Sequence, residues 1–173
     1  MLFSFKILMM GDFGCGKTSL VRRFVENSFS EDYLSTIGVS LSKKTVTVEC
    51  NEELSALMII WDIEGDTAFR SMTKQYIMGA HGVIVVGDLT RSDTLESIDR
   101  HLKTCREHDP EMPVCIALNK KDLPHDDPTE RLEAFRTKNG VVSLHQTSAK
   151  TGDDVEQLFE DLLRAVFKRM DKC

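Results

Sequence analysis

The sequence predicts an α/β domain of three layers, in which helices cover both faces of a six-stranded, mostly parallel sheet with one antiparallel strand. Apolar runs of strand length recur along the chain and are nearly continuous, which is typical of strands buried on both faces. Stretches with helical spacing lie between these runs, and a short turn joins two of the strands. The 173 residues match the usual size of one domain, so we expect a single domain over residues 1–173.

The expected strands follow from the apolar runs in chain order. Residues 45–48 alternate between polar and apolar side chains, and the turn-like residues 49–53 connect them to the next run, which predicts a hairpin. The apolar runs lie at residues 7–10, 57–61, 83–86, 114–118 and 141–144. Ligands of such a sheet bind at the carboxyl ends of its strands, so the segments that follow these runs are where we expect the site.

Two helices are clearest. The last one begins after Gly152 and Asp153 and carries Lys168 and Arg169 in its last turn, where positive charge suits the helix dipole. Its apolar face, spaced at three and four residues, consists of Val155, Leu158, Phe159, Leu162, Leu163, Val166, Phe167 and Met170. An earlier single helix is expected between a cap at Ser92 or Asp93 and Pro110, with one face formed by Leu95, Ile98, Leu102 and Cys105.

Composition excludes several classes of protein. Lysine and arginine total 22 against 28 acidic residues, a net charge of −6, which argues against bulk electrostatic binding to nucleic acid or to an anionic membrane. No basic, apolar leader begins the chain, and no apolar run reaches the length of a membrane-spanning helix. We therefore expect a cytoplasmic protein.

The cysteines indicate a reducing compartment. They are odd in number and form no C-x-x-C pair, so we expect neither a disulfide framework nor a zinc site. The five positions are Cys15, Cys50, Cys105, Cys115 and Cys173. Cys15 lies in a glycine-rich loop near a helix N-terminus that could lower the pKa of its thiol, but a small buried side chain is the favoured interpretation.

A phosphate-binding loop follows the first expected strand. Residues 11–18 read GDFGCGKT, which fits the G-x-x-x-x-G-K-[ST] pattern in its strand–loop–helix context. Glycines let backbone N–H groups surround phosphate oxygens, while Lys17 pairs with the β and γ phosphates and the Thr18 hydroxyl ligates Mg²⁺. The loop residues expected to contact the nucleotide are Phe13, Gly14, Cys15, Gly16, Lys17, Thr18 and Ser19.

Two further motifs indicate the base. The sequence NKKD at residues 119–122 and the sequence SAK at residues 148–150 each follow an expected strand, and they resemble the guanine-binding motifs of small GTPases. A carboxylate can accept from both the ring N–H and the exocyclic amine of guanine, and adenine lacks that donor pair. The resemblance implies that Asp122 takes this role, with Asn119 beside it, that Lys120 lies along the base and that the Ala149 N–H meets the guanine oxygen. Ser148 and Lys150 complete the expected base-binding set.

The resemblance to small GTPases of the Ras superfamily covers nearly the whole chain and is closest to the Rab group. It implies the P-loop NTPase fold, GTP or GDP with Mg²⁺ as ligands, and two switch segments ordered by the γ-phosphate. Residues 29–38 resemble the first switch, in which Phe29 flanks the guanine and Thr36 completes the Mg²⁺ shell. Residues 61–65 keep the D-x-x-G pattern of the second switch, in which Asp62 holds Mg²⁺ through a water and the Gly65 N–H senses the γ-phosphate.

Three residues depart from the family pattern beside the γ-phosphate. Asp66 stands where a glutamine usually orients the attacking water, and a carboxylate only accepts hydrogen bonds and is a poor base at neutral pH. Phe13 replaces a small residue, and Glu64 replaces alanine. With Lys17 and Gly65 as the other catalytic residues, we expect slow hydrolysis, at or below about 10⁻⁴ s⁻¹.

The resemblance also implies partners. Leu41, Trp61 and Tyr76 match the surface by which Rab proteins meet effectors, although Trp61 could equally pack between the hairpin and the second switch. We expect a monomer served by an exchange factor and an activating protein, in membrane traffic or signalling. Rab proteins normally end in a prenylated tail, and Cys173 is not in a C-a-a-X box. Either a lipidated tail that attaches the protein to the cytosolic face of membranes lies outside this sequence, or the protein works without a lipid.

Two other functions remain open from the sequence. A pseudo-GTPase interaction module would keep one conformation whatever its nucleotide. A P-loop phosphotransferase that acts on a small metabolite is disfavoured, because the sequence contains no evident lid or second substrate motif.

Overall fold

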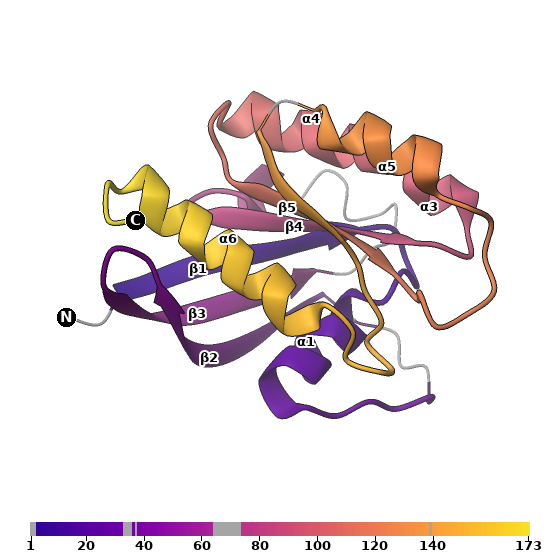
Figure 1. The fold of residues 1–173 in the computed structure, drawn as a ribbon, viewed down its shortest axis with the longest axis horizontal. Helices are drawn as coiled ribbons and strands as arrows, with labels where there is room; N and C mark the ends of the chain where they lie inside the picture. Colours follow the sequence, from indigo (N-terminus) through magenta and orange to yellow (C-terminus); the bar gives the residue numbers. More distant parts are fainter. Residues whose placement is uncertain (1–2, 33–35, 37, 64–73, 139) are drawn as a thin grey trace.

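The computed structural model describes residues 3–32, 36, 38–63, 74–138 and 140–173. Its sheet has six strands in the order β2-β3-β1-β4-β5-β6, and all neighbours pair in parallel except β2 and β3 (Figure 1). The predicted fold class is therefore confirmed. The strands are β1 (Phe3–Gly11), β2 (Val39–Glu49), β3 (Glu53–Ile63), β4 (Gly82–Asp88), β5 (Val114–Asn119) and β6 (Val141–Gln146), and the helices are α1 (Lys17–Glu26), α3 (Ser92–Glu96), α4 (Ile98–His108), α5 (Thr129–Arg136) and α6 (Val155–Arg169).

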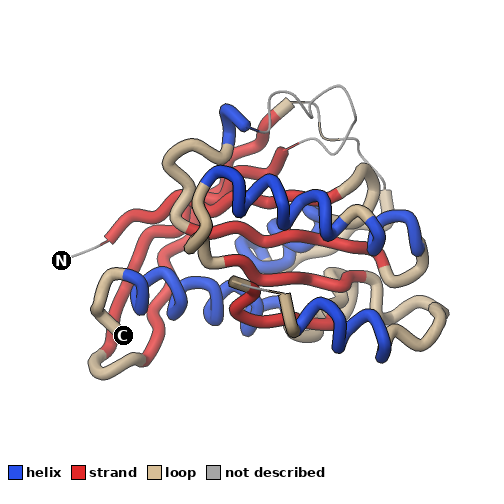
Figure 2. Tube along the Cα trace, turned by 90° about the horizontal axis from the view of Figure 1, so that it is seen from above, coloured by secondary structure: helices blue, strands red, loops and turns tan. Residues whose placement is uncertain are grey.

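Helices cover both faces of the sheet, as Figure 2 shows from above. One apolar cluster joins the sheet to α1 and α6, where the rings of Phe24 and Phe159 stack with centroids 3.9 Å apart. The other cluster joins the opposite face to α3, α4 and α5. Every residue of β4 and of β5 is buried, because these strands lie inside the sheet with helices on both sides. This is the physical reason for their unbroken apolar runs.

The parallel strands direct their carboxyl ends to one edge of the sheet. The loops after β1, β4, β5 and β6 therefore meet there, as expected for a doubly covered parallel sheet. The hairpin lies beside them, with β2 running antiparallel to β3 from Val39 opposite Ile63 to Glu49 opposite Glu53. It is longer than the alternating segment 45–48 that predicted it, because the remaining β2 residues are mostly polar, none of them is buried, and they carry no periodic apolar signal.

The helices differ from expectation in two places. The single helix expected over Leu95 to Cys105 is divided into α3 and α4 at Ser97. The Ser97 hydroxyl donates to the carbonyl of Asp93 at 3.1 Å, and such a bond back to the preceding turn bends helices. The short helix α5 follows Pro128 and was not expected, because it buries only Leu132 and Phe135 and so lacks a periodic apolar face.

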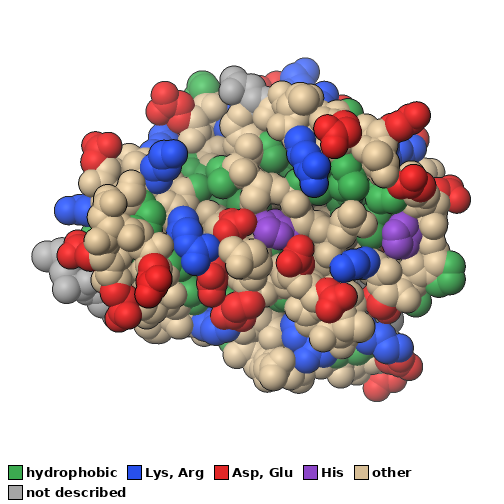
Figure 3. Space-filling view, viewed as in Figure 1, with side chains coloured by type: hydrophobic (Ala, Val, Ile, Leu, Met, Phe, Trp, Pro, Cys, Tyr) green, Lys and Arg blue, Asp and Glu red, His purple; other side chains and the backbone are tan. Residues whose placement is uncertain are grey.

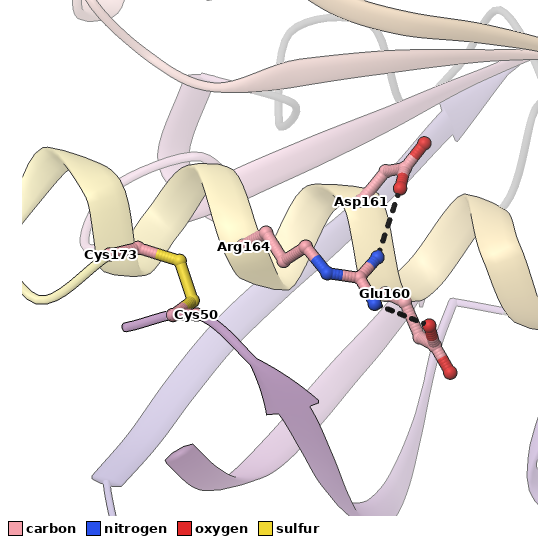
Figure 4. Close-up of a disulfide and its surroundings, with 5 residues drawn as sticks. All are labelled: Cys50, Glu160, Asp161, Arg164 and Cys173. Carbon is pink, nitrogen blue, oxygen red and sulfur yellow. Dashed lines mark hydrogen bonds and ion pairs between the residues drawn. A yellow bond between two sulfur atoms is a disulfide. The ribbon is translucent and has the colours of Figure 1, made fainter. Parts of the chain in front are cut away.

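The expectation that the chain forms no disulfide is wrong for one pair. Cys50, in the turn between β2 and β3, is bonded to Cys173, which follows α6, with their Cα atoms 4.8 Å apart (Figure 4). Since 123 residues separate the two cysteines, only the packing of α6 along the hairpin brings them together. The same figure shows Arg164 of α6 paired with Glu160 and Asp161, at 2.9 and 3.1 Å.

The other three cysteines are free and buried. Burial raises the pKa of the Cys15 thiol, and it raises the pKa values of Cys105 and Cys115 to about 12. Cys15 is therefore an inert packing residue, as the favoured interpretation of the sequence had it.

On the face seen in Figure 3, acidic and basic side chains are interspersed. Within the part of the chain that the structure describes, no helix has the length and apolar character needed to cross a membrane.

Candidate nucleotide-binding site

A cavity of about 310 Å³ opens at the carboxyl edge of the sheet. It lies between the loop after β1, the segment after α1, and the loops that follow β5 and β6. All the described candidates for nucleotide binding line it except Cys15 and Ser148, which are buried. Those that line it are Phe13, Gly14, Gly16, Lys17, Thr18, Ser19, Phe29, Thr36, Asn119, Lys120, Asp122, Ala149 and Lys150.

Side chains from elsewhere in the fold hold the carbonyl groups of the phosphate-binding loop. Each carbonyl oxygen of residues 11–15 accepts a hydrogen bond from a side chain. Because C=O and N–H point in opposite directions across a trans peptide, these bonds direct the N–H groups of residues 12–16 away from the donors. The donors are Lys17 to Gly11 O and Asp12 O at 2.9 and 3.2 Å, Arg91 to Phe13 O at 2.8 Å, Lys120 to Gly14 O at 2.9 Å and Asn119 to Cys15 O at 3.2 Å.

Gly16 and Asn119 join this loop to the base-binding side. The backbone of Gly16 has φ +101°, and a Cβ there would collide with the Asn119 amide, so both conformation and space require glycine. The Asn119 side chain is buried, and its Oδ1 accepts from the Thr147 hydroxyl and from the Ala149 N–H, at 3.3 and 3.2 Å. One amide thus connects the loops after β1 and β6.

The three residues expected to hold Mg²⁺ converge. The Thr18 hydroxyl lies 2.5 Å from the Thr36 hydroxyl and 2.5 Å from Oδ2 of Asp62. Asp62 is buried, and its Oδ1 has no hydrogen-bond partner among the described residues. Burial raises the pKa of this carboxyl, although the bond from Thr18 and the charge of Lys17 act against that rise. A divalent cation with oxygen ligands would satisfy the orphaned oxygen, so the donor set fits Mg²⁺.

At the base-binding end of the cavity, hydrogen bonds and an ion pair hold the side chains of Asp122 and Lys120. Asp122 accepts from the Ser148 hydroxyl at 2.6 Å. Lys120 has a left-handed backbone, with φ +67°, and its ammonium group lies 2.6 Å from the fully buried Asp88. The other oxygen of Asp88 accepts from the N–H and the hydroxyl of Thr90, at 2.8 and 2.6 Å. Asp88 is a supporting residue that the motifs did not reveal.

The loop of residues 148–150 differs from expectation at one atom. The Ala149 N–H, expected to meet the guanine oxygen, donates to Asn119 instead. Lys150 and Glu31 both line the cavity, and the Lys150 ammonium group pairs with Glu31 at 2.7 Å and lowers the pKa of that carboxyl. The residues that follow α1 thereby contact the loop after β6.

A second cluster missed by the motifs supports the phosphate-binding loop. Oδ1 of Asp12 accepts from Arg100 at 2.8 Å and lies 3.1 Å from Nε2 of His101, both on α4. Burial acts to raise the pKa of Asp12, but hydrogen bonds from His101 and Ser97, with the charges of His101 and Arg100, lower it to about 2. No sequence signal connects Asp12 with a helix 88 residues later.

Comparison with known proteins shows the family. The family described as Ras matches residues 6–168. The chain belongs to the Ras family. Within it, the chain is similar to Ras-related protein YPTC6 of Chlamydomonas reinhardtii, with 36% identity over 98% of this chain and 78% of that protein. Human Ras-related protein Rab-25 is 36% identical over 98% and 79%, and GTP-binding protein ypt3 of Schizosaccharomyces pombe is 34% identical over 96% and 77%. The resemblance to the Rab group is thus confirmed, and this Ras-family protein is a Rab-like small GTPase.

The expected effector residues of this Rab-like GTPase lie on and beside the hairpin. Leu41 is 53% exposed on β2, opposite Trp61 on β3. Trp61 is half-buried, with its ring 6.3 Å from that of Tyr76 and the Lys6 ammonium 4.0 Å from its centroid. Trp61 therefore both packs beside Tyr76 and presents part of its ring to solvent.

Three residues of the expected site lie outside the described residues. They are Glu64, Gly65 and Asp66 of the second switch. Phe13, the third departure from the family pattern, is described, lines the cavity and is 44% exposed.

Proposed function

We propose that this Rab-like GTPase is a Mg²⁺-dependent guanine-nucleotide switch that hydrolyses GTP slowly and recruits effectors when GTP is bound. The observation that carries the proposal is the convergence of Thr18, Thr36 and Asp62 beside the phosphate-binding loop. Thr36 comes from the first switch, so its place beside Thr18 is one that a γ-phosphate and its metal ion would stabilise. The orphaned Oδ1 of Asp62 supports the same assignment.

In this proposal each group has a defined task. Lys17 would exchange the carbonyls of Gly11 and Asp12 for the β and γ phosphates, while backbone N–H groups of the loop surround the phosphate oxygens. Thr18 and Thr36 would ligate Mg²⁺ directly, and Asp62 would hold it through a water. The bound ion would neutralise charge on the phosphate oxygens.

The base would lie at the other end of the cavity. Asp122 would accept from the ring N–H and the exocyclic amine of guanine, in the orientation that its bond from Ser148 maintains. The ring of Phe29 and the stem of Lys120 would flank the base, since both line the cavity.

Slow hydrolysis follows from the residues around the γ-phosphate. Phe13 occupies the cavity where an activating arginine would enter, and its carbonyl is anchored by Arg91, which restrains the backbone there. Asp66 would bring negative charge toward the triphosphate and could not donate to the attacking water. Glu64 would add repulsion. Without an arginine finger, the rate enhancement of roughly 10³–10⁵ that such a finger supplies is lost.

Partners and location follow the Rab group in this proposal. Effectors would dock on Leu41, Trp61 and Tyr76, and an exchange factor and an activating protein would act on the switches. The protein would work as a monomer in the cytoplasm, in membrane traffic or signalling, and it would attach peripherally to the cytosolic face of membranes only if it carries a lipidated tail.

The test is the nucleotide that the protein carries. The purified protein is denatured, and the released nucleotide is separated by chromatography. Recovered GTP supports the slow switch, and GDP supports an active GTPase. Absence of nucleotide, with no binding of added GTP in the presence of Mg²⁺, would support the pseudo-GTPase module. A single-turnover rate tenfold above about 10⁻⁴ s⁻¹ would contradict slow hydrolysis.

A further inference from the structure

We infer that Arg23 is a positioning residue for guanine recognition, because its guanidinium group sets the direction of the peptide units in the loop of residues 148–150. The inference rests on the proposed function and on the expectation from the family resemblance that this loop meets the 6-oxygen of guanine. Neither the motifs nor the residues that line the cavity include Arg23.

All three nitrogens of the Arg23 side chain are engaged. Nε donates to the carbonyl of Ala149 at 2.8 Å, and Nη2 donates to the carbonyl of Lys150 at 2.6 Å. Nη1 donates to the backbone and side-chain oxygens of Asn27, at 3.2 and 3.1 Å. Asn27 in turn caps α1, where its N–H donates to the carbonyl of Arg23. The guanidinium group therefore fixes the base-binding loop to the end of α1, although Arg23 and Ala149 are 126 residues apart in the sequence.

No carboxylate pairs with Arg23 among the described residues. Its charge is directed at backbone carbonyls instead, and hydrogen bonds from a charged donor are stronger than neutral ones. Arginine suits this place because its planar fork can reach two successive carbonyls at once, which a single ammonium group does less well.

These bonds decide which N–H group of the loop is available. With the Ala149 carbonyl turned toward Arg23, the Lys150 N–H points the opposite way across the trans peptide. The neighbouring N–H groups are already used, since Ala149 donates to Asn119 and Thr151 donates to the Ser148 hydroxyl at 3.1 Å. The Lys150 N–H has no partner among the described residues, and Lys150 lines the cavity. Arg23 thus presents this N–H group as a donor for the guanine 6-oxygen.

The test uses nucleotide analogues that change one edge of the base at a time. In 6-thio-GDP a sulfur, which is a weak acceptor, replaces the 6-oxygen and leaves the contacts of Asp122 unchanged. In inosine diphosphate the exocyclic amine is missing, so Asp122 loses one of its two contacts while the ring N–H and the 6-oxygen remain. Dissociation constants of GDP and of both analogues are measured with Mg²⁺ for the wild type and for Arg23→Gln, Arg23→Lys and Lys44→Gln.

The expected result is a change in one ratio only. Wild type should prefer GDP over 6-thio-GDP by about threefold to tenfold, the effect of one hydrogen bond. In Arg23→Gln this ratio should fall toward one, while the preference for GDP over inosine diphosphate should stay as in wild type. Arg23→Lys should lie between, because one ammonium group can hold only part of the loop.

Lys44→Gln is the matched control. Lys44 also binds the end of α1, through the Phe24 carbonyl at 2.8 Å, and pairs with Glu156, but it makes no contact with residues 148–150. Its removal should lower stability and leave both ratios unchanged. Circular dichroism melts show whether each variant is folded, and if Arg23→Gln is unfolded, Arg23→Lys supplies the comparison.

An unchanged preference for GDP over 6-thio-GDP in the folded Arg23 variants would overturn the inference, because Arg23 would then only support the fold. Failure of the wild type to bind GDP or GTP would instead overturn the proposed function, and the inference with it.

Discussion

Reduction of the bond between Cys50 and Cys173 should lower the stability of the protein strongly. The bond closes a loop of 123 residues. In the chain-entropy relation for cross-links, a loop of that length restricts the unfolded chain by about 5 kcal/mol at 25 °C. For a domain of this size each kcal/mol corresponds to about 2–4 °C in melting temperature, so we expect the oxidised protein to melt about 10–20 °C above the reduced one.

The assay is a thermal melt followed by circular dichroism, with and without a thiol reductant. Cys50→Ser is the control, because it should melt near the reduced wild type and should not respond to the reductant. Alkylation of the denatured but unreduced wild type should modify three of its five cysteines, since Cys15, Cys105 and Cys115 are free. Equal melting of oxidised and reduced wild type, with the bond verified by alkylation, would refute the entropic argument.

Three further predictions concern the site. The double variant Asp66→Gln, Phe13→Ser should hydrolyse GTP faster in a single turnover, because the glutamine can donate a hydrogen bond to the attacking water and the serine leaves more room in the cavity. An unchanged rate would count against our account of slow hydrolysis. Gly16→Ala should weaken GDP binding at least about tenfold in equilibrium dialysis, since its Cβ would displace Asn119, and unchanged affinity would show that the loop adapts. The pKa of the Asp12 carboxyl is about 2 in the folded protein, lower than its ordinary value of 3.8. Ionised Asp12 should therefore stabilise the protein above about pH 4, and this effect should be lost as the pH falls toward 2. The free energy of unfolding, measured with urea at several pH values, should fall by about 1–2 kcal/mol less in Asp12→Asn than in wild type between about pH 4 and pH 2, with screening by solvent included. The same fall in both proteins would contradict this prediction.

The spacing of apolar residues along the chain predicted the strands and helices whose buried side chains recur in a regular pattern. The interior strands were found because burial on both faces requires an apolar side chain at every position. The last helix was found because its buried face repeats at helical spacing. The break at Ser97 and the short helix α5 were missed, because a helix bend depends on one hydroxyl and α5 buries too few residues to show a period.

The sequence likewise predicted those parts of the site that consist of contiguous residues. The phosphate-binding loop and the two base-binding motifs need fixed residue types at fixed spacing, because backbone and side chain act together over one turn. Thr36 and Asp62 were placed only through the family resemblance, and the structure brings both to Thr18.

The sequence by itself therefore predicted the sheet and the family, and its motifs named the residues that we propose to touch the nucleotide. Only the tertiary structure decided which side chains hold those residues in place. Three such contacts join positions that are 88 to 127 residues apart in the sequence. They are the hydrogen bonds from Arg23 to the loop of residues 148–150, the hydrogen bond from Arg100 to Asp12, and the disulfide between Cys50 and Cys173. Such pairs have no sequence signature, because a hydrogen bond or a disulfide needs only the final distance between two groups, and that distance is set by how the helices pack on the sheet.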